Sequence, residues 1–75
     1  MVYIRIVCEN EGIVLHCYKG SEDGEYFKLV IDSKTKEIIE RPEGPDIDAS
    51  AAYSHVYNLL CSGEPLPKKT VAAWG

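Results

Sequence analysis

The stretch Asp46–Gly63, DIDASAAYSHVYNLLCSG, decides the fold because it is the one convincing helix in the chain. At 100° per residue its apolar side chains fall on one face and most of its polar ones on the other. The apolar face consists of Ala49, Ala52, Tyr53, Val56, Leu59 and Leu60. Asp46 or Asp48 supplies the N-cap, and Gly63 with Pro65 ends the helix. Such a helix needs one sheet to cover.

The chain before this helix alternates apolar and polar residues with a period of two, which is typical of strands. The expected strands are Val2–Cys8, Ile13–Tyr18, Tyr26–Ile31 and Glu37–Arg41. We therefore predict an α+β fold, a four-stranded antiparallel meander with the helix packed on one face. The tail Leu66–Gly75 carries Val71 and Trp74, which are too apolar for a free tail, so we expect a short extra strand or a packed turn there.

The length of 75 residues allows one small domain, residues 1–75. A chain this short buries only about 60% of its unfolded surface, so a second copy would add useful burial. The odd cysteine count, three, does not make a disulfide framework, and no apolar run reaches the ~20 residues of a membrane span. We expect a cytoplasmic protein without membrane contact. The net charge of −4 disfavours a dedicated nucleic-acid binder.

The informative feature is the sheet face that the helix leaves uncovered, because it is not simply polar. Setting Ile6 opposite Leu15, and Leu15 opposite Leu29, arranges the outward side chains in three rows across the strands. The aromatic row is Tyr3, Tyr18 and Tyr26; the basic row is Arg5, His16 and Lys28, with Arg41 if the fourth strand pairs residues 28 and 41; the aliphatic row is Val7, Val14, Val30 and Ile39.

Three interpretations of this face stay open. Contiguous apolar side chains favour a protein interface, most simply a homodimer, with Tyr3, Val14, Tyr18, Tyr26, Val30 and Ile39 as anchors. Alternatively, the face binds an anion or a single-stranded nucleic acid, with Arg5, His16, Lys28 and Arg41 on phosphates and bases stacked on the tyrosines. The third interpretation is that valine and isoleucine simply favour strands and the tail covers them.

No constellation of catalytic or metal-binding residues is convincing. Cys8 and Cys17 take inward positions in strands, and Cys61 lies near a helix C-terminus, where the dipole disfavours a thiolate. The two histidines and three cysteines contain no zinc spacing, and the run from Asp46 lacks the glycine and the final glutamate of a calcium loop. We expect a non-enzymatic binding domain without a cofactor.

The helix followed by Ser62-Gly63-Glu64-Pro65-Leu66-Pro67 resembles the end of HicB-type antitoxin domains, in which a helix runs into a G-x-P-x-P turn. The resemblance covers about residues 49–67 and extends to the order of strands before helix. It implies a partial RNase H-like β-β-β-α-β unit that binds and masks a small toxin, often as an oligomer. This chain departs from that pattern by its fourth expected strand, Glu37–Arg41, and by the Pro-Glu-Gly-Pro connection before the helix.

Overall fold

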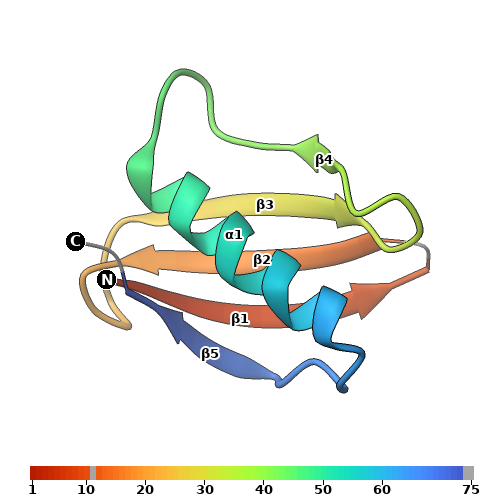
Figure 1. The fold of residues 1–75 in the computed structure, drawn as a ribbon. Coiled ribbons are helices and arrows are strands. Elements are labelled where there is room, and N and C mark those ends of the chain that lie inside the picture. Colours follow the sequence, from red (N-terminus) through yellow and green to blue (C-terminus); the bar gives the residue numbers. More distant parts are fainter. Residues whose placement is uncertain (11, 74–75) are drawn as a thin grey trace.

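The computed structural model describes residues 1–10 and 12–73 and consists of one antiparallel sheet and one helix (Figure 1). The elements follow in the order β1 (Val2–Glu9), β2 (Gly12–Lys19), β3 (Tyr26–Asp32), β4 (Ile38–Glu40), α1 (Ile47–Ser62) and β5 (Lys69–Ala72). The helix lies diagonally across one face of the sheet, and the other face carries no helix (Figure 1). After the helix, the tail of the chain returns as β5 and lies beside β1, at the lower edge of the sheet in Figure 1.

The five strands have the spatial order β4-β3-β2-β1-β5. The α+β class and the antiparallel sheet are confirmed. The four expected strands are joined by a fifth, because the tail, expected as a short strand or a packed turn, pairs with β1 from Val2↔Ala72 to Arg5↔Lys69. The expected register is found: Ile6 lies opposite Leu15, Leu15 opposite Leu29 and Cys17 opposite Phe27. Trp74 falls outside the described residues.

The fourth strand departs from the expected register. Val30 pairs with Glu40 and Ile31 with Ile38, so Ile39 is the extra residue of a β-bulge. Ile39 is 61% exposed at this bulge, and Glu40 takes the outer-face position beside Val30. Arg41 instead lines a cavity with Ala49 of α1 on the helix side of the sheet. The placement of Arg41 in the basic row and of Ile39 in the aliphatic row is therefore wrong.

The core lies between the helix and the inner face of the sheet. Val2, Ile4, Ile6, Ile13, Leu15, Cys17, Phe27, Leu29 and Ile31 form one buried cluster with Ala49, Ala52, Val56 and Ala72. Tyr53, Leu60 and Leu66 pack against it while partly exposed. The small alanines let the helix approach the sheet closely. Cys8, expected to be a core thiol, is exposed at the end of β1 beside the turn.

Polar contacts fix the helix on the sheet at three places. The Asp46 carboxylate is the N-cap, accepts from the backbone N–H groups of Asp48 and Ala49, and also binds the Lys19 ammonium at 3.1 Å. Tyr53 donates its hydroxyl to the Lys36 carbonyl at 2.6 Å, and His55 Nε2 lies 2.8 Å from Thr70 Oγ1. The helix ends at Gly63, whose left-handed φ of 77° suits glycine.

Candidate functional site: the helix-free sheet face

The strand register arranges the side chains of the helix-free face in rows, as expected for β1 to β3. Tyr3, Tyr18 and Tyr26 lie opposite one another in the aromatic row, and Val7, Val14 and Val30 in the aliphatic row. Between them lies the basic row of Arg5, His16 and Lys28. Strand β5 extends two rows, because Lys69 pairs with Arg5 and Val71 with Tyr3. The basic row therefore ends in Lys69, and not in Arg41.

A fourth row lies beyond the aliphatic one, and it is acidic at both ends. Glu9 pairs with Gly12, and Gly12 pairs with Asp32. The Asp32 carboxylate accepts from the backbone N–H groups of Lys34 and Thr35. These hydrogen bonds, the one from Thr35 foremost, hold the pKa of Asp32 below its usual value, which favours the charged carboxylate at this end of the row. Along the strands the face therefore reads aromatic, basic, aliphatic, acidic.

The middle of the face is partly ordered by contacts among its own rings. His16 Nδ1 lies 2.8 Å from the Tyr26 hydroxyl, and their rings stack at 5.9 Å between centroids. The ring of Tyr18 also contacts that of Tyr26, with 5.4 Å between the two ring centroids. At the β4 edge the Lys28 ammonium pairs with Glu40 at 3.6 Å. Val7, Tyr26 and Val71 nevertheless remain 40%, 48% and 41% exposed, so apolar surface is accessible across the whole face.

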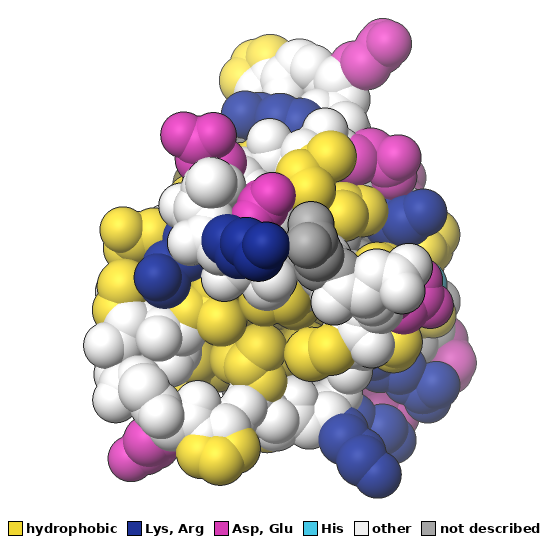
Figure 2. All heavy atoms as spheres, turned by 90° about the vertical axis from the view of Figure 1, so that its right-hand side faces the viewer, with side chains coloured by type: hydrophobic (Ala, Val, Ile, Leu, Met, Phe, Trp, Pro, Cys, Tyr) yellow, Lys and Arg dark blue, Asp and Glu magenta, His cyan; other side chains and the backbone are white. Residues whose placement is uncertain are grey.

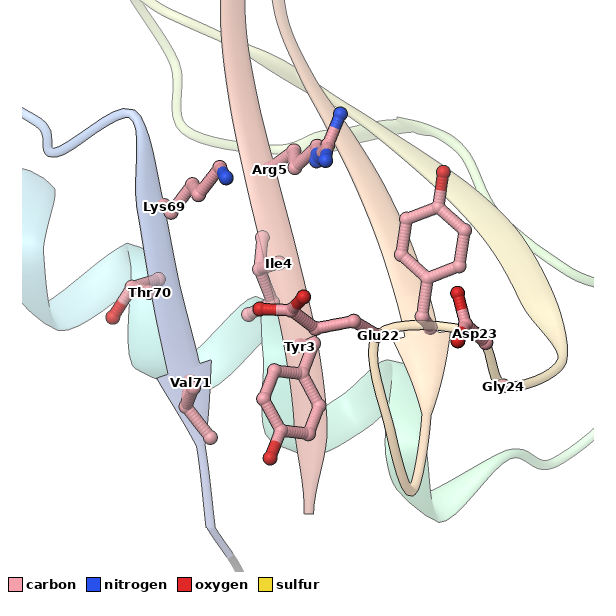
Figure 3. Close-up of a pocket in the computed structure, with 10 residues that line it drawn as sticks. Tyr3, Ile4, Arg5, Glu22, Asp23, Gly24, Lys69, Thr70 and Val71 are labelled. Atoms are coloured by element: carbon pink, nitrogen blue, oxygen red, sulfur yellow. The ribbon is translucent and has the colours of Figure 1, made fainter.

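A groove of about 510 Å³ opens on this face between β5 and the turn from β2 to β3 (Figure 3). It is lined by Tyr3, Ile4, Arg5, Tyr18, Glu22, Asp23, Gly24, Lys69, Thr70 and Val71. Figure 3 shows Glu22 reaching from the turn over β1, while Lys69 points from β5 toward Arg5. Gly24 fixes the turn, because a Cβ at this position would collide with the Lys19 carbonyl. The groove thus combines two cations, two carboxylates and tyrosine rings.

The charged groups of the groove are not paired with each other. Arg5, Lys69, Glu22 and Asp23 make no ion pair with any residue that the structure describes. By contrast, Lys19 beside the turn is saturated by Glu25 at 3.2 Å, Asp46 at 3.1 Å and Asp48 at 3.8 Å. Hydrogen bonds to Asp46 and then Glu25 raise the pKa of Lys19. Lys19 is therefore a structural cation, and the groove charges are the ones available to a ligand.

A second cavity, of about 330 Å³, lies on the helix side between β4 and α1. Arg41, Ser50 and Ser54 supply its polar groups, and Leu29, Ile38 and Ala49 its apolar wall. Tyr53 also lines it, but its hydroxyl is already bonded to Lys36. The guanidinium expected on the helix-free face is therefore separated from the basic row by the sheet itself.

The thiols of Cys17 and Cys61 lie in different surroundings. Burial raises the pKa of the Cys17 thiol to about 12, which keeps it protonated. Cys61 is exposed, and its charge and hydrogen bond raise the pKa of Tyr57 one helical turn earlier. No group of three or more histidine, cysteine or acidic side chains within residues 1–10 and 12–73 is placed to hold a metal ion.

The surface at one end of the domain carries both signs of charge. Figure 2 shows acidic and basic side chains interspersed around a central group of hydrophobic ones, without a continuous basic stripe. In the described part of the chain, no helix is long and apolar enough to cross a membrane.

Sequence reasoning did not place four groups in this site: Lys69, Val71, Glu22 and Asp23. The alternation of Lys69 and Val71 with Thr70 and Ala72 was the signal for the first two, since only a strand sends alternate residues to one face. No pattern in the turn itself indicates that it borders a groove.

The chain was also compared with known proteins. No family model, no curated protein and no solved structure matches it.

Proposed function

We propose that this protein is a non-enzymatic interaction domain that forms a symmetric homodimer through the helix-free sheet face. The centre of the interface is the aliphatic row Val7, Val14 and Val30. A standard interface buries about 800 Å² on each partner, roughly one sixth of the 4863 Å² accessible surface of this chain. One face of a five-stranded sheet supplies an area of that order, and burying it adds the apolar burial that a small core lacks.

The observation that carries this proposal is the order of the rows: basic, aliphatic, acidic. In a two-fold symmetric pair, the same patch serves both copies. If the axis runs along the aliphatic row, valines meet valines, and the basic row of each copy lies over the acidic row of the other. Arg5 then lies over Glu9 of the second copy, and Lys28 over Asp32 of the second copy. The face is therefore complementary to itself.

Gly12 fits the same arrangement. It occupies the middle of the acidic row, and the symmetry places His16 of the second copy above it. A Cβ at Gly12 would meet only ordinary contacts, with Glu9 O at 3.6 Å and Val30 Cγ1 at 3.7 Å. The fold of the single chain therefore does not demand glycine at this position. The missing side chain leaves room on the outer face for an imidazole from a partner.

The valines and the charges have different roles in such a dimer. Exposed ion pairs contribute only about 0.2–1 kcal/mol each, so they select the register and the partner. Val14 is already buried in the single chain, so burial of Val7 and Val30 supplies the affinity. The HicB-like resemblance of residues 49–67 favours the same class of function, a protein-binding domain that oligomerises.

Binding of single-stranded nucleic acid is the second candidate, favoured by the addition of Lys69 to a basic row that runs beside the tyrosines. Glu22 and Asp23 oppose it, because they line the same groove as Tyr3 and Tyr18 and repel phosphates. Phosphate binding also weakens steeply with salt, whereas a valine-centred dimer does not.

Sedimentation equilibrium of matched charge variants tests the dimer. Arg5→Glu and Glu9→Arg each place like charges across the axis, so each variant alone should be largely monomeric. The doubly exchanged protein, and an equimolar mixture of the two single variants, should dimerise again. Glu64→Arg, at an exposed position outside the face, is the control and should dimerise like the parent protein.

The mixture is the decisive arm, because Arg5 and Glu9 lie on one strand and do not pair within a chain. Recovery of the dimer in the mixture requires the pairing to be between chains. A parent protein that is monomeric at all concentrations, or a mixture that stays monomeric, would overturn the proposal. Titration of that monomer with single-stranded oligonucleotides then tests the second candidate.

A further inference from the structure

We infer that the groove between β5 and the β2–β3 turn binds a small zwitterion of the amino-acid class, with an apolar side chain. The groove takes in the aromatic row and the Arg5–Lys69 end of the basic row, away from the aliphatic row at the centre of the proposed dimer, so this inference does not rest on the dimer. Its volume of about 510 Å³ is within the roughly 300–1,000 Å³ of small-molecule sites.

The charges of the groove select the ligand. Arg5 and Lys69 come from neighbouring strands, paired directly in the sheet, and Lys69 points toward Arg5 (Figure 3). Two adjacent cations make a seat for a carboxylate, and the guanidinium can donate two parallel hydrogen bonds to it. Glu22 reaches over β1 from the opposite wall, with Asp23 beside it in the turn (Figure 3). These carboxylates make a seat for an ammonium group.

Both seats are open to a ligand because their groups lack partners among the described residues. Opposite charges that line one groove without forming an ion pair to each other can both be neutralised by a molecule that carries both signs. A plain anion would meet Glu22 and Asp23, and a plain cation would meet Arg5 and Lys69. The groove therefore discriminates against either single charge and favours the zwitterion.

An apolar wall is available for the body of the ligand. Tyr3 and Val71 are paired neighbours at the floor of the groove, and Val71 is 41% exposed. Tyr18 lines the side nearer the turn. Tyrosine rings stack well on a flat apolar group, so an aromatic amino acid is the best fit. The wall of the turn is held by Gly24, by the bond from Gly20 N–H to Met1 O and by the bond from Lys19 N–H to Glu25 O.

Titrations followed by ¹H–¹⁵N chemical shifts test the inference with three related probes. L-Phenylalanine carries both charges, N-acetyl-L-phenylalanine lacks the ammonium, and phenethylamine lacks the carboxylate. We expect phenylalanine to shift the amides of residues 3–5, 22–24 and 69–71. Each of the other two should bind about tenfold more weakly, the effect of one lost hydrogen bond to a charged group.

Two variants assign the seats. Lys69→Gln should weaken binding of phenylalanine and N-acetylphenylalanine by about five- to tenfold and should not weaken binding of phenethylamine, because it removes a like charge from the groove. Glu22→Gln should weaken binding of phenylalanine and phenethylamine and should not weaken binding of the N-acetyl derivative, because it removes a like charge from the groove. Lys28→Gln, on the same face but outside the groove, is the control and should alter none of them.

The inference is overturned if phenylalanine shifts no groove amide at millimolar concentration, or if Lys69→Gln and Glu22→Gln act equally on all three probes. Tighter binding of N-acetylphenylalanine than of phenylalanine would also overturn it, because the groove would then be a simple anion site. Arg5 belongs to both surfaces, so the groove is tested with Lys69 and Glu22, which take no part in the proposed dimer pairs Arg5 with Glu9 and Lys28 with Asp32.

Discussion

Lys19 at the end of β2 holds Asp46 at 3.1 Å across 27 residues of sequence, and Asp46 is the N-cap of the only helix in the described chain. One carboxylate therefore caps the N-terminus of the helix and also binds the helix to the sheet. Its other partners are the backbone N–H groups of Asp48 and Ala49. Both functions can be separated by substitution, because asparagine caps as well as aspartate but carries no charge.

The first prediction concerns this N-cap. Asp46→Ala should destabilise the domain by about 1 kcal/mol for the cap, and further for the lost contact with Lys19. Asp46→Asn keeps the cap, so it should lose only the stability that comes from the contact with Lys19. Urea unfolding followed by circular dichroism of both variants measures the difference. Equal losses for the two would show that capping contributes nothing and that the ion pair carries the whole effect.

Acid should destabilise the protein partly through the same residue. Burial alone would raise the pKa of Asp46, but the Lys19 ammonium and the backbone donors outweigh it and hold this pKa below the ordinary 3.8. A carboxyl whose folded pKa is depressed contributes stability above its unfolded pKa, and this contribution is lost as pH falls through the folded value. Asp46→Asn should therefore flatten the decline of the melting temperature below about pH 4.

Alkali should act through Cys17. Burial raises its pKa from 9.0 to about 12, so between these values the unfolded chain loses a proton that the folded chain keeps. Stability is thus complete below pH 9 and falls as pH rises toward 12. Replacing the thiol with the similarly sized apolar group of Cys17→Val should make this decline shallower than in the parent. A decline of the same slope in both proteins would assign it to other groups.

Gly24 is predicted to be essential for the β2–β3 turn. In Gly24→Ala the new methyl group meets the Lys19 backbone carbonyl, and a backbone atom does not move away as a side-chain tip does. We expect a loss of stability, with the largest amide shifts in residues 19–25. Ser21→Ala is the matched control in the same turn, at an exposed side chain. Unaltered shifts in Gly24→Ala would mean that the turn adopts another conformation without cost.

Gly12 gives a test of the dimer that leaves the fold intact. Gly12→Ala adds only ordinary contacts within the chain and has no positive φ to strain, so the melting temperature of the dilute protein should not fall. In the dimer, however, the methyl group occupies the space proposed for His16 of the second copy. The dissociation constant should rise several-fold in sedimentation equilibrium. An unchanged dissociation constant would contradict a two-fold axis along the aliphatic row.

Much of the sheet could be predicted because the inward residues of β1 to β3 are apolar and the turns between the strands are short. A slip by one residue would expose the core, and the turn lengths selected the register of Ile6 opposite Leu15 over a slip by two, which would keep the same residues outward but scramble the rows. The bulge at Ile39 could not be predicted, because Ile38 and Ile39 are equally apolar and either could face inward. Cys8 was predicted to be buried, and its side chain does lie on the inner side of the sheet, opposite Ile13. It is exposed because the helix does not extend over the end of β1 (Figure 1).

The groove could not be derived from sequence, because it depends on two segments about fifty residues apart. Glu22 and Asp23 belong to a turn whose acids read as ordinary solvated charges. Lys69 joins them only because β5 pairs with β1, and that pairing brings Lys69 beside Arg5. The alternation in this short tail indicates a strand, but it does not indicate which edge of the sheet the strand joins.

The pairing of β1 with β5 also has a consequence for the order of folding. Val2 and Ala72 pair across β1 and β5, and both are buried, at 0% and 1% exposure. This pair brings together residues from near the two ends of the described chain. During synthesis, the hairpins of β1 to β3 can form from local contacts, but one edge of β1 stays open until the tail leaves the ribosome. Nascent chains that lack residues 69–72 therefore expose a hydrogen-bonding edge, where a neighbouring nascent chain can add a strand in place of β5.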